Sequence, residues 1–143
     1  MRLGALVALA LLSFPLAAAQ AQTPCATSGT DQTCTNSTTI SGGAIGISDA
    51  ATLTLTNTMT GTVSGVGTNS SGVSATTANV TNAGTIASTG TSTSVAISAA
   101  TINLTNSGTI RGIGGSVIGG GIAGTDVNVT NSGTIIGYTY GIS

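Results

Sequence analysis

The chain has 143 residues, a formal net charge of −1 at pH 7, and only two basic and three acidic residues. This length allows one domain at most, and so few charges exclude a basic footprint for nucleic acid and an acidic interaction tail. Regularly spaced Val, Ile and Leu with almost no charge also exclude ordinary disorder, which combines low hydrophobicity with high net charge. The composition therefore indicates a β-rich repeat protein.

Residues 1–21 have the features of a secretory signal peptide. A short positive end precedes an apolar run, which is followed by small residues in an A-x-A arrangement. Pro15 interrupts a stretch that is already shorter than the ~20 apolar residues of a membrane-spanning helix, which argues against a membrane anchor. We therefore expect Sec-type export, with cleavage after Ala21 or Ala19.

Residues 22–40 are expected to form an N-terminal cap region that contains Cys25 and Cys34. Export would place both cysteines in an oxidising compartment, where they can close a small loop. We expect a structural disulfide, which contributes about 2–3 kcal/mol on the chain-entropy model. The alternative is that Cys34 fills an inward position as a small hydrophobic residue, and both hold if Cys25 folds over the end of the first coil. No metal site is expected, because no His or further Cys completes a ligand set.

The rest of the chain is organised by a phrase that recurs about every 25 residues, a period typical of solenoids. Its clearest copy is VNVTNSGTI. An older-looking copy carries a two-residue insertion with Met59, and the faintest has Thr38 where the glycine stands elsewhere. The five copies begin at Gln32, Leu53, Ala78, Ile102 and Val127.

Each copy predicts short strands joined by a turn. Val127 and Val129 alternate with polar residues, the period-two pattern of a half-buried strand. We expect the Asn-Ser-Gly that follows to turn the chain, because Gly and Asn tolerate positive φ and the Asn side chain can bond to nearby backbone. Residues 133–135 predict a second strand, and a third short signal, such as residues 96–98, follows in every copy.

Three strands and three turns in about 25 residues predict one rung of a parallel β-helix, in which strands of successive rungs lie about 4.8 Å apart. The expected fold is therefore all-β: about five rungs, with the repeats over residues 41–143 incomplete at the C-terminus, preceded by a cleaved signal peptide. An antiparallel sandwich is the competing fold. A sandwich would not require the same residue at the same position of every repeat, whereas a β-helix stacks identical residues on one another.

The repeat also predicts a structural Asn ladder, because a side-chain amide both donates and accepts hydrogen bonds along the helix axis. A row of threonines that includes Thr81 and Thr105 is expected to point outward, while apolar columns point inward. The predicted ladder consists of Asn36, Asn57, Asn82, Asn106 and Asn131.

The sequence predicts no catalytic, cofactor-binding or metal-binding residues and no cofactor. Acid-base catalysis needs a His or a pair of carboxylates with a suitably shifted pKa. The chain has no His, and its three aspartates fall in different rungs and at different positions of the repeat. The glycine-rich residues 112–119 lack a P-loop lysine. Tyr138 and Tyr140 are expected to share one face and to cover a loop or the next rung, with ligand contact as the alternative.

The residues VTNSGTI, repeated behind a Sec-type leader, resemble the passenger region of bacterial autotransporters, especially the adhesin-like members, over about residues 31–143. Similar repeats occur in two-partner hemagglutinin-type adhesins. The resemblance implies a rod that is displayed outside the cell and makes multivalent contacts. Family members carry a C-terminal outer-membrane β-barrel, and nothing here resembles its strands. The chain is therefore expected to be a fragment or a truncated product, with membrane contact only through a missing barrel.

The expected function is a non-enzymatic passenger or stalk of an exported bacterial surface protein. Two alternatives are a Thr-ladder module that binds glycan or ice, and the noncatalytic part of a polysaccharide-acting β-helix enzyme. Expected partners are other copies, through the open β-helix ends, and a glycan or host-surface ligand, but no nucleic acid. The expected location is the cell surface or outside the cell for an autotransporter, and the periplasm if the chain is complete as given.

Overall fold

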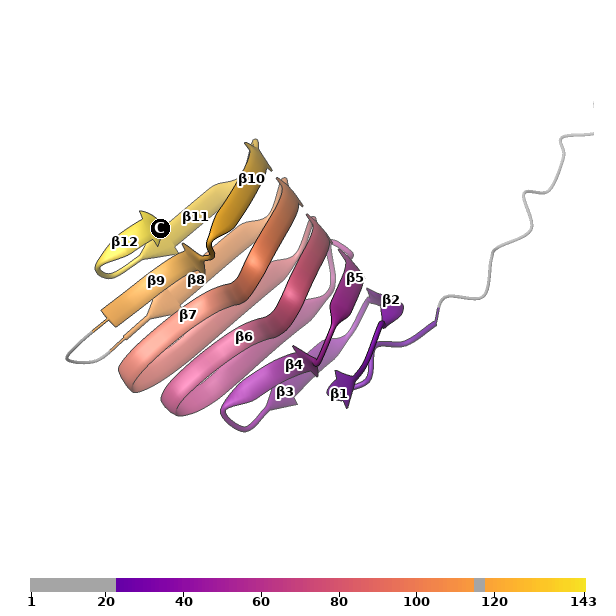
Figure 1. Cartoon of the computed structure of the whole chain (residues 1–143), viewed down its shortest axis with the longest axis horizontal. Coiled ribbons are helices and arrows are strands. Elements are labelled where there is room, and N and C mark those ends of the chain that lie inside the picture. Colours follow the sequence, from indigo (N-terminus) through magenta and orange to yellow (C-terminus); the bar gives the residue numbers. More distant parts are fainter. Residues whose placement is uncertain (1–22, 115–117) are drawn as a thin grey trace, which may run out of the picture.

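The computed structural model describes residues 23–114 and 118–143, which form a parallel β-solenoid of about five turns. The chain winds around three sides, and its turns are stacked side by side from the N-terminal to the C-terminal end (Figure 1). No helix occurs in the described residues. The prediction of an all-β parallel solenoid is therefore confirmed, whereas the predicted signal peptide, residues 1–21, lies outside the described residues.

Twelve strands make up the described part of the chain and belong to one sheet. They are β1 (Ser28–Gly29), β2 (Thr33–Asn36), β3 (Thr39–Gly42), β4 (Ile45–Asp49), β5 (Thr52–Asn57), β6 (Thr62–Asn82), β7 (Thr85–Asn106), β8 (Thr109–Ile113), β9 (Ile118–Ala123), β10 (Asp126–Asn131), β11 (Thr134–Gly137) and β12 (Tyr140–Ile142).

The strands pair in parallel along three sides. The first side contains β2, β5, residues 77–82 of β6, residues 101–106 of β7, and β10. The second side contains β3, β8 and β11, and the third contains β4, β9 and β12. The long strands β6 and β7 bend around the corners and contribute to all three sides, as the broad bands in Figure 1 show.

The repeated phrase pairs with itself residue by residue, which builds the core. On the first side Cys34, Leu55, Val80, Leu104 and Val129 are successive register partners and form one inward column. Alternate residues face outward, because side chains alternate across a strand. Each buried aliphatic side chain contributes about 1.5–3 kcal/mol relative to exposure. The fully buried side chains of the other columns include Ile47, Leu53, Val63, Val73, Ile86, Ile97, Ile102, Ile110 and Ile122.

The glycine in the turn after each ladder asparagine has a different physical role from the predicted one. No described glycine has a positive φ, and Asp31 is the only described residue of another type that does, so the expected role of glycine in the turn is wrong. Close stacking requires glycine instead: a Cβ on Gly84 would meet the carbonyl oxygen of Gly61 in the preceding rung, and one on Gly108 would meet that of Gly84. In the first rung Thr38 occupies this position and is exposed.

Replacing Gly108 with Ala is expected to lower the free energy of unfolding by about 1–3 kcal/mol, the cost of overpacking a site that cannot expand. Gly43→Ala is the matched control, because a Cβ there would meet nothing within 4 Å. Urea denaturation followed by circular dichroism measures both variants. Equal midpoints for the two variants would contradict this explanation of the turn.

Candidate functional site

The outer surface of the first side carries two rows of uncharged polar side chains, which we name the Thr/Asn face. Its members lie at the same phase of successive rungs, in register. All are exposed except Asn79, which is half-buried. Neighbouring rungs repeat at about 4.8 Å and alternate residues of a strand at about 6.8 Å, so hydroxyl and amide groups form a regular grid. The face consists of Thr54, Thr56, Asn79, Thr81, Asn103, Thr105, Asn128 and Thr130.

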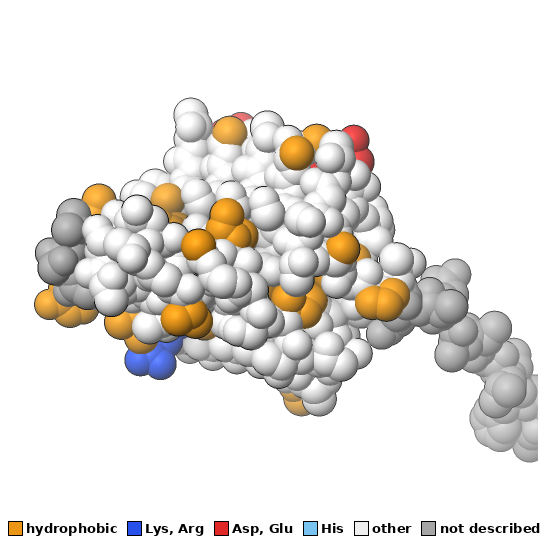
Figure 2. Space-filling model, turned by 90° about the horizontal axis from the view of Figure 1, so that it is seen from below, with side chains coloured by type: hydrophobic (Ala, Val, Ile, Leu, Met, Phe, Trp, Pro, Cys, Tyr) orange, Lys and Arg blue, Asp and Glu red, His pale blue; other side chains and the backbone are white. Residues whose placement is uncertain are grey.

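The Thr/Asn face is shallow and uncharged. It surrounds an open depression of about 220 Å³ that is lined by threonine and asparagine residues of this face together with Val80 and Leu104. Asn103 Nδ2 donates to Asn79 Oδ1 over 2.9 Å, which fixes two amides in the outer row. Figure 2 shows one face of the molecule, on which charged side chains are few and hydrophobic side chains are scattered. Hydrogen bonding and close contact, rather than charge, are what such a surface offers a ligand.

The five asparagines of the repeat form one column at the corner between the first and second sides. Each Nδ2 donates to the Oδ1 of the next asparagine, at 2.9 Å from Asn36 and 2.7 Å in each later step. Within a rung the same amide group also donates to the carbonyl of the following glycine, as Asn82 does to Gly84 at 3.2 Å. The first four asparagines are at most 2 % exposed. Because an unpaired buried amide is costly, the column holds the rungs in register.

A second buried polar cluster lies at the corner between the second and third sides. Ser88 Oγ is 2.8 Å from Ser70 Oγ and 2.7 Å from Ser94 Oγ, and it donates to the Ser70 carbonyl. Ser88 stands where Gly65 and Gly112 stand in the neighbouring rungs. The hydroxyls bond to each other and to backbone, with no bonded His or carboxylate to activate them among the described residues. These hydrogen bonds join the strand segments at this corner, and no repeated sequence signal indicated the cluster.

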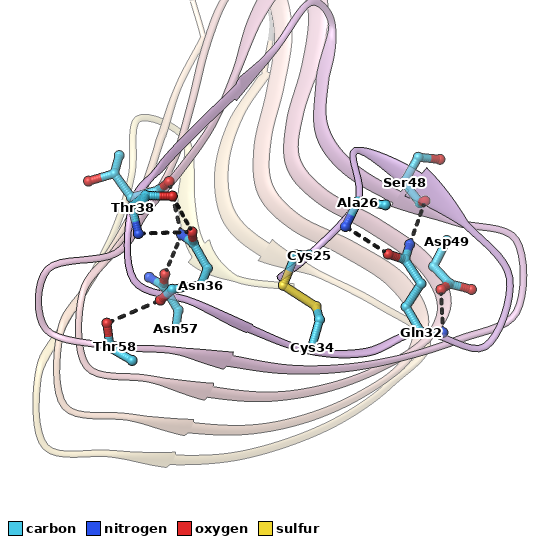
Figure 3. The surroundings of a disulfide bond; sticks show 11 residues. Cys25, Ala26, Gln32, Cys34, Asn36, Thr38, Ser48, Asp49, Asn57 and Thr58 are labelled. Atoms are coloured by element: carbon cyan, nitrogen blue, oxygen red, sulfur yellow. Dashed lines mark hydrogen bonds between the residues drawn. A yellow bond between two sulfur atoms is a disulfide. The ribbon is translucent and has the colours of Figure 1, made fainter. Parts of the chain in front are cut away.

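The N-terminal end of the solenoid is closed by a cap. Cys25 and Cys34 form a disulfide, and Figure 3 shows it crossing from the capping segment to the first rung. Cys34 is 5 % exposed and also begins the inward column of the first side, so it has both of the roles that the sequence left open. Pro24 bridges to Thr35 on β2, and β1 pairs with β4. β2 and the first two residues of β3 fall within residues 22–40 and already belong to the first rung.

Asp49 holds the other corner of the cap, a role that sequence reasoning missed. Its carboxylate is 4 % exposed and accepts backbone N–H bonds from Asp31 at 3.0 Å, Gln32 at 2.9 Å and Ala51 at 2.8 Å. Burial by itself would raise the pKa of Asp49, but these bonds, together with one from the Gln32 side chain, outweigh it and lower the pKa. The bond to Ala51, two residues on, is an Asx turn, which is the one local signal in the sequence.

The described residues, 23–114 and 118–143, contain no group of three or more His, Cys, Asp or Glu side chains that could hold a metal ion. The cap brings Asp31 close to Asp49 through backbone bonds, while Asp126 lies exposed on β10 in the last rung. In the same part of the chain no helix is long and apolar enough to cross a membrane.

The two tyrosines flank the bend between β11 and β12 and differ in exposure. Tyr138 follows β11 and is 75 % exposed. Tyr140 begins β12, is half-buried, and has its ring over Gly120 of the preceding rung. Tyr140 thus packs against a neighbouring rung, and Tyr138 is the more accessible ring.

Fold and surface together define this chain as a parallel β-solenoid with an uncharged outer face. Comparison with protein-family models, with curated proteins and with solved structures found no match to it.

Replacing Asn82 with Ala is expected to lower the free energy of unfolding by about 2–4 kcal/mol. The change leaves the Asn57 amide without its 2.7 Å acceptor and the Asn106 oxygen without its donor, both in a buried corner. Asn79→Ala, three residues earlier on the outside of the same strand, is the control and should cost under about 1 kcal/mol. Urea denaturation compares them, and equal losses would show that the column does not hold the rungs.

The stability of the cap is expected to depend on the ionisation of Asp49. Because the pKa is lowered on folding, the stabilisation is present above the unfolded-state pKa, near 3.8, and is lost as pH falls through the folded-state pKa. The parent should therefore lose stability as pH falls below about 4, whereas Asp49→Asn should be less stable at neutral pH and change less with acid. Exposed Asp126→Asn is the control. Urea denaturation over a pH series measures this, and identical profiles for parent and Asp49→Asn would contradict it.

Proposed function

We propose that this chain is a non-enzymatic, adhesin-like passenger or stalk region of an exported bacterial surface protein of the autotransporter type. In this proposal a Sec-type signal directs export, and the rod presents its outer faces at the cell surface. Its mechanism is display and multivalent contact, since many weak contacts on a rigid support produce avidity without any single strong site.

One observation carries the proposal: among the described residues, the side chains with distinctive chemistry already make contacts that stabilise the solenoid. The ladder asparagines bond to each other, the cysteines are joined, and Asp49 is saturated by backbone donors. Every buried side-chain nitrogen or oxygen in the described part has a partner. What is left for contact is the outer surface, with rows such as Thr81 and Thr105 repeated on each rung. A repeated neutral surface supports a contact function better than a reaction.

A specific observation favours one second candidate, in which the Thr/Asn face itself recognises an ordered polymer, such as a glycan, or ice. Its grid of hydroxyls and amides is regular and open. Amides supply donors and acceptors together, and hydroxyls do the same, which suits the hydroxyl groups of a sugar chain. This candidate requires tight binding by a single soluble chain, whereas the adhesin-like proposal requires multivalent display.

Beads densely coated with the chain are expected to adhere to glycan-bearing or host-cell surfaces, while the soluble chain binds at least about tenfold more weakly. Replacing both Thr81 and Thr105 with Asp should abolish adhesion if the Thr/Asn face makes the contact. The matched control replaces Thr85 and Thr109, which lie in register on the second side, with Asp.

Adhesion assays with a glycan array, and a measurement of thermal hysteresis, separate the candidates. Strong binding or hysteresis by the soluble chain, lost only in the first-side variant, would favour the second candidate. Beads that adhere to no surface, or release of sugar from a polysaccharide incubated with the chain, would overturn the adhesin-like proposal.

A further inference from the structure

The depression in the Thr/Asn face is a groove that runs along the solenoid axis. It is lined by residues of β5, β6, β7 and β10, which lie side by side on the first side (Figure 1). One wall is the row that contains Thr81 and Thr105, and the other is the row that contains Asn79 and Asn103. Four strands span roughly 14 Å along the axis, whereas the two rows are only about 6.8 Å apart. The groove is therefore longer along the axis than along a strand.

The floor of the groove is backbone. Val80 and Leu104 lie between the two walls and point inward, with 4 % and 3 % of their surface exposed. Each strand pairs with its neighbour in register over this side, so both walls continue from rung to rung without a shift. The groove is thus shallow, and it presents equivalent positions at the spacing of the rungs.

Within the described residues, the second and third sides do not continue such a pair of polar rows. On the second side, the row next to Thr85 passes from Ala87 to Arg111 in successive rungs. On the third side, an outward row passes from Ser98 to Ala123. Two polar rows that face each other over several rungs are therefore particular to the first side.

The walls of the groove have hydrogen-bonding groups to offer. Asn103 Nδ2 donates to Asn79 Oδ1 over 2.9 Å, so Asn103 keeps its oxygen and Asn79 keeps its NH₂ group for other partners. The hydroxyls of Thr81 and Thr105 form no hydrogen bond to any described residue. A hydroxyl can both donate and accept. Both walls therefore match a ligand that has hydroxyl groups along its two edges.

Charge restricts the ligand further. Among the described strands of the first side, Asp126 is the one charged residue, and it is exposed. It precedes Asn128 by two positions and therefore lies on the same outward face, about 6.8 Å along the strand from the wall of the groove. A carboxylate without a neighbouring cation repels an anionic ligand but not a neutral one. The groove therefore fits a neutral chain.

We propose that this groove binds a neutral, unbranched polysaccharide in an extended conformation, with the sugar chain along the solenoid axis. The rungs repeat at about 4.8 Å, which is close to the advance per sugar of an extended β-1,4-linked hexose chain, so successive sugars meet equivalent side chains. None of the residues that line the groove is aromatic, so the contact consists of hydrogen bonds and is weak for a single chain. The inference rests on the adhesin-like proposal, since it names the chemical class that the displayed face contacts.

The test is an NMR titration of the isotope-labelled full chain with cellohexaose, a neutral β-1,4-linked glucose hexamer. Saturable shifts are expected for the backbone amides of residues 79–81 and 103–105, which line the groove. Affinity should rise from the disaccharide to the tetrasaccharide, because each added sugar reaches another rung. Absence of saturable shifts, or shifts confined to the second or third side, would overturn the proposal.

Two other sugar hexamers test the shape and the charge of the ligand. Maltohexaose is neutral, but its α-1,4 linkages curve the chain. The β-1,4-linked hexamer of glucuronic acid is extended but has a carboxylate on every sugar. Both should bind more weakly than cellohexaose, and the deficit of the acidic hexamer should grow at low salt. Equal binding of maltohexaose would contradict an extended chain along the axis, and equal binding of the acidic hexamer would contradict a neutral ligand.

Variants of the chain test the walls. Thr81→Val and Thr105→Val together remove two hydroxyls from one wall and should weaken cellohexaose binding about tenfold. The matched control has Thr85→Val and Thr109→Val, in register on the second side, and should bind like the parent. Equal affinities of the two double variants would overturn the assignment of the groove, and the sugar series on the parent decides the question if a variant fails to fold.

The bead assay distinguishes failure of this inference from failure of the adhesin-like proposal. If coated beads adhere to glycan-bearing or host-cell surfaces but cellohexaose does not bind, the polysaccharide assignment is wrong and the adhesin-like proposal stands. If cellohexaose binds in the groove but the beads adhere to no surface, the groove assignment stands and the adhesin-like proposal is wrong.

Discussion

In-register stacking of one rung on the next is the constraint on which the rest of this structure depends. A single rung of about 25 residues has too few apolar side chains to form a core, and it becomes stable only when its neighbours cover it. Parallel pairing puts each residue over its counterpart, so an inward position must be apolar or must have its hydrogen bonds satisfied inside the coil. The asparagine column meets the second condition, because an amide is both donor and acceptor.

This constraint explains which departures from the repeat are tolerated. The insertion after Asn57 moves the turn glycine from two residues beyond the asparagine to four, at Gly61. The Asn57 amide still reaches the Gly61 carbonyl at 3.2 Å, while Met59 projects outward and is 84 % exposed. The corner keeps its hydrogen bonds, and the extra residues lie in solvent. A larger side chain at an inward position cannot extend into solvent in this way, because the core is closely packed.

The first and last described rungs show the same constraint, because each has a neighbouring rung on one side only. The first rung lacks a preceding copy, and the chain replaces it with dissimilar parts: a disulfide, a short bridge at Pro24, and the carboxylate of Asp49 acting on three backbone N–H groups. The last described rung has its core residues half-buried and a ladder donor without a further acceptor.

The sequence by itself determined the repeat, the three-strand rung, the inward columns and the outward threonines, because identical residues at a constant phase leave a stacked solenoid as the simplest arrangement. Tertiary structure alone decided why the turn glycines are needed, since a Cβ on Gly84 would meet the carbonyl oxygen of Gly61 only because successive turns lie so close together. It also decided the Ser88 cluster and the Asp49 cap, whose partners lie up to 24 residues apart in the chain and carry no repeated signal. Periodicity reports what every rung shares, whereas a contact made once depends on which segments the coil brings together.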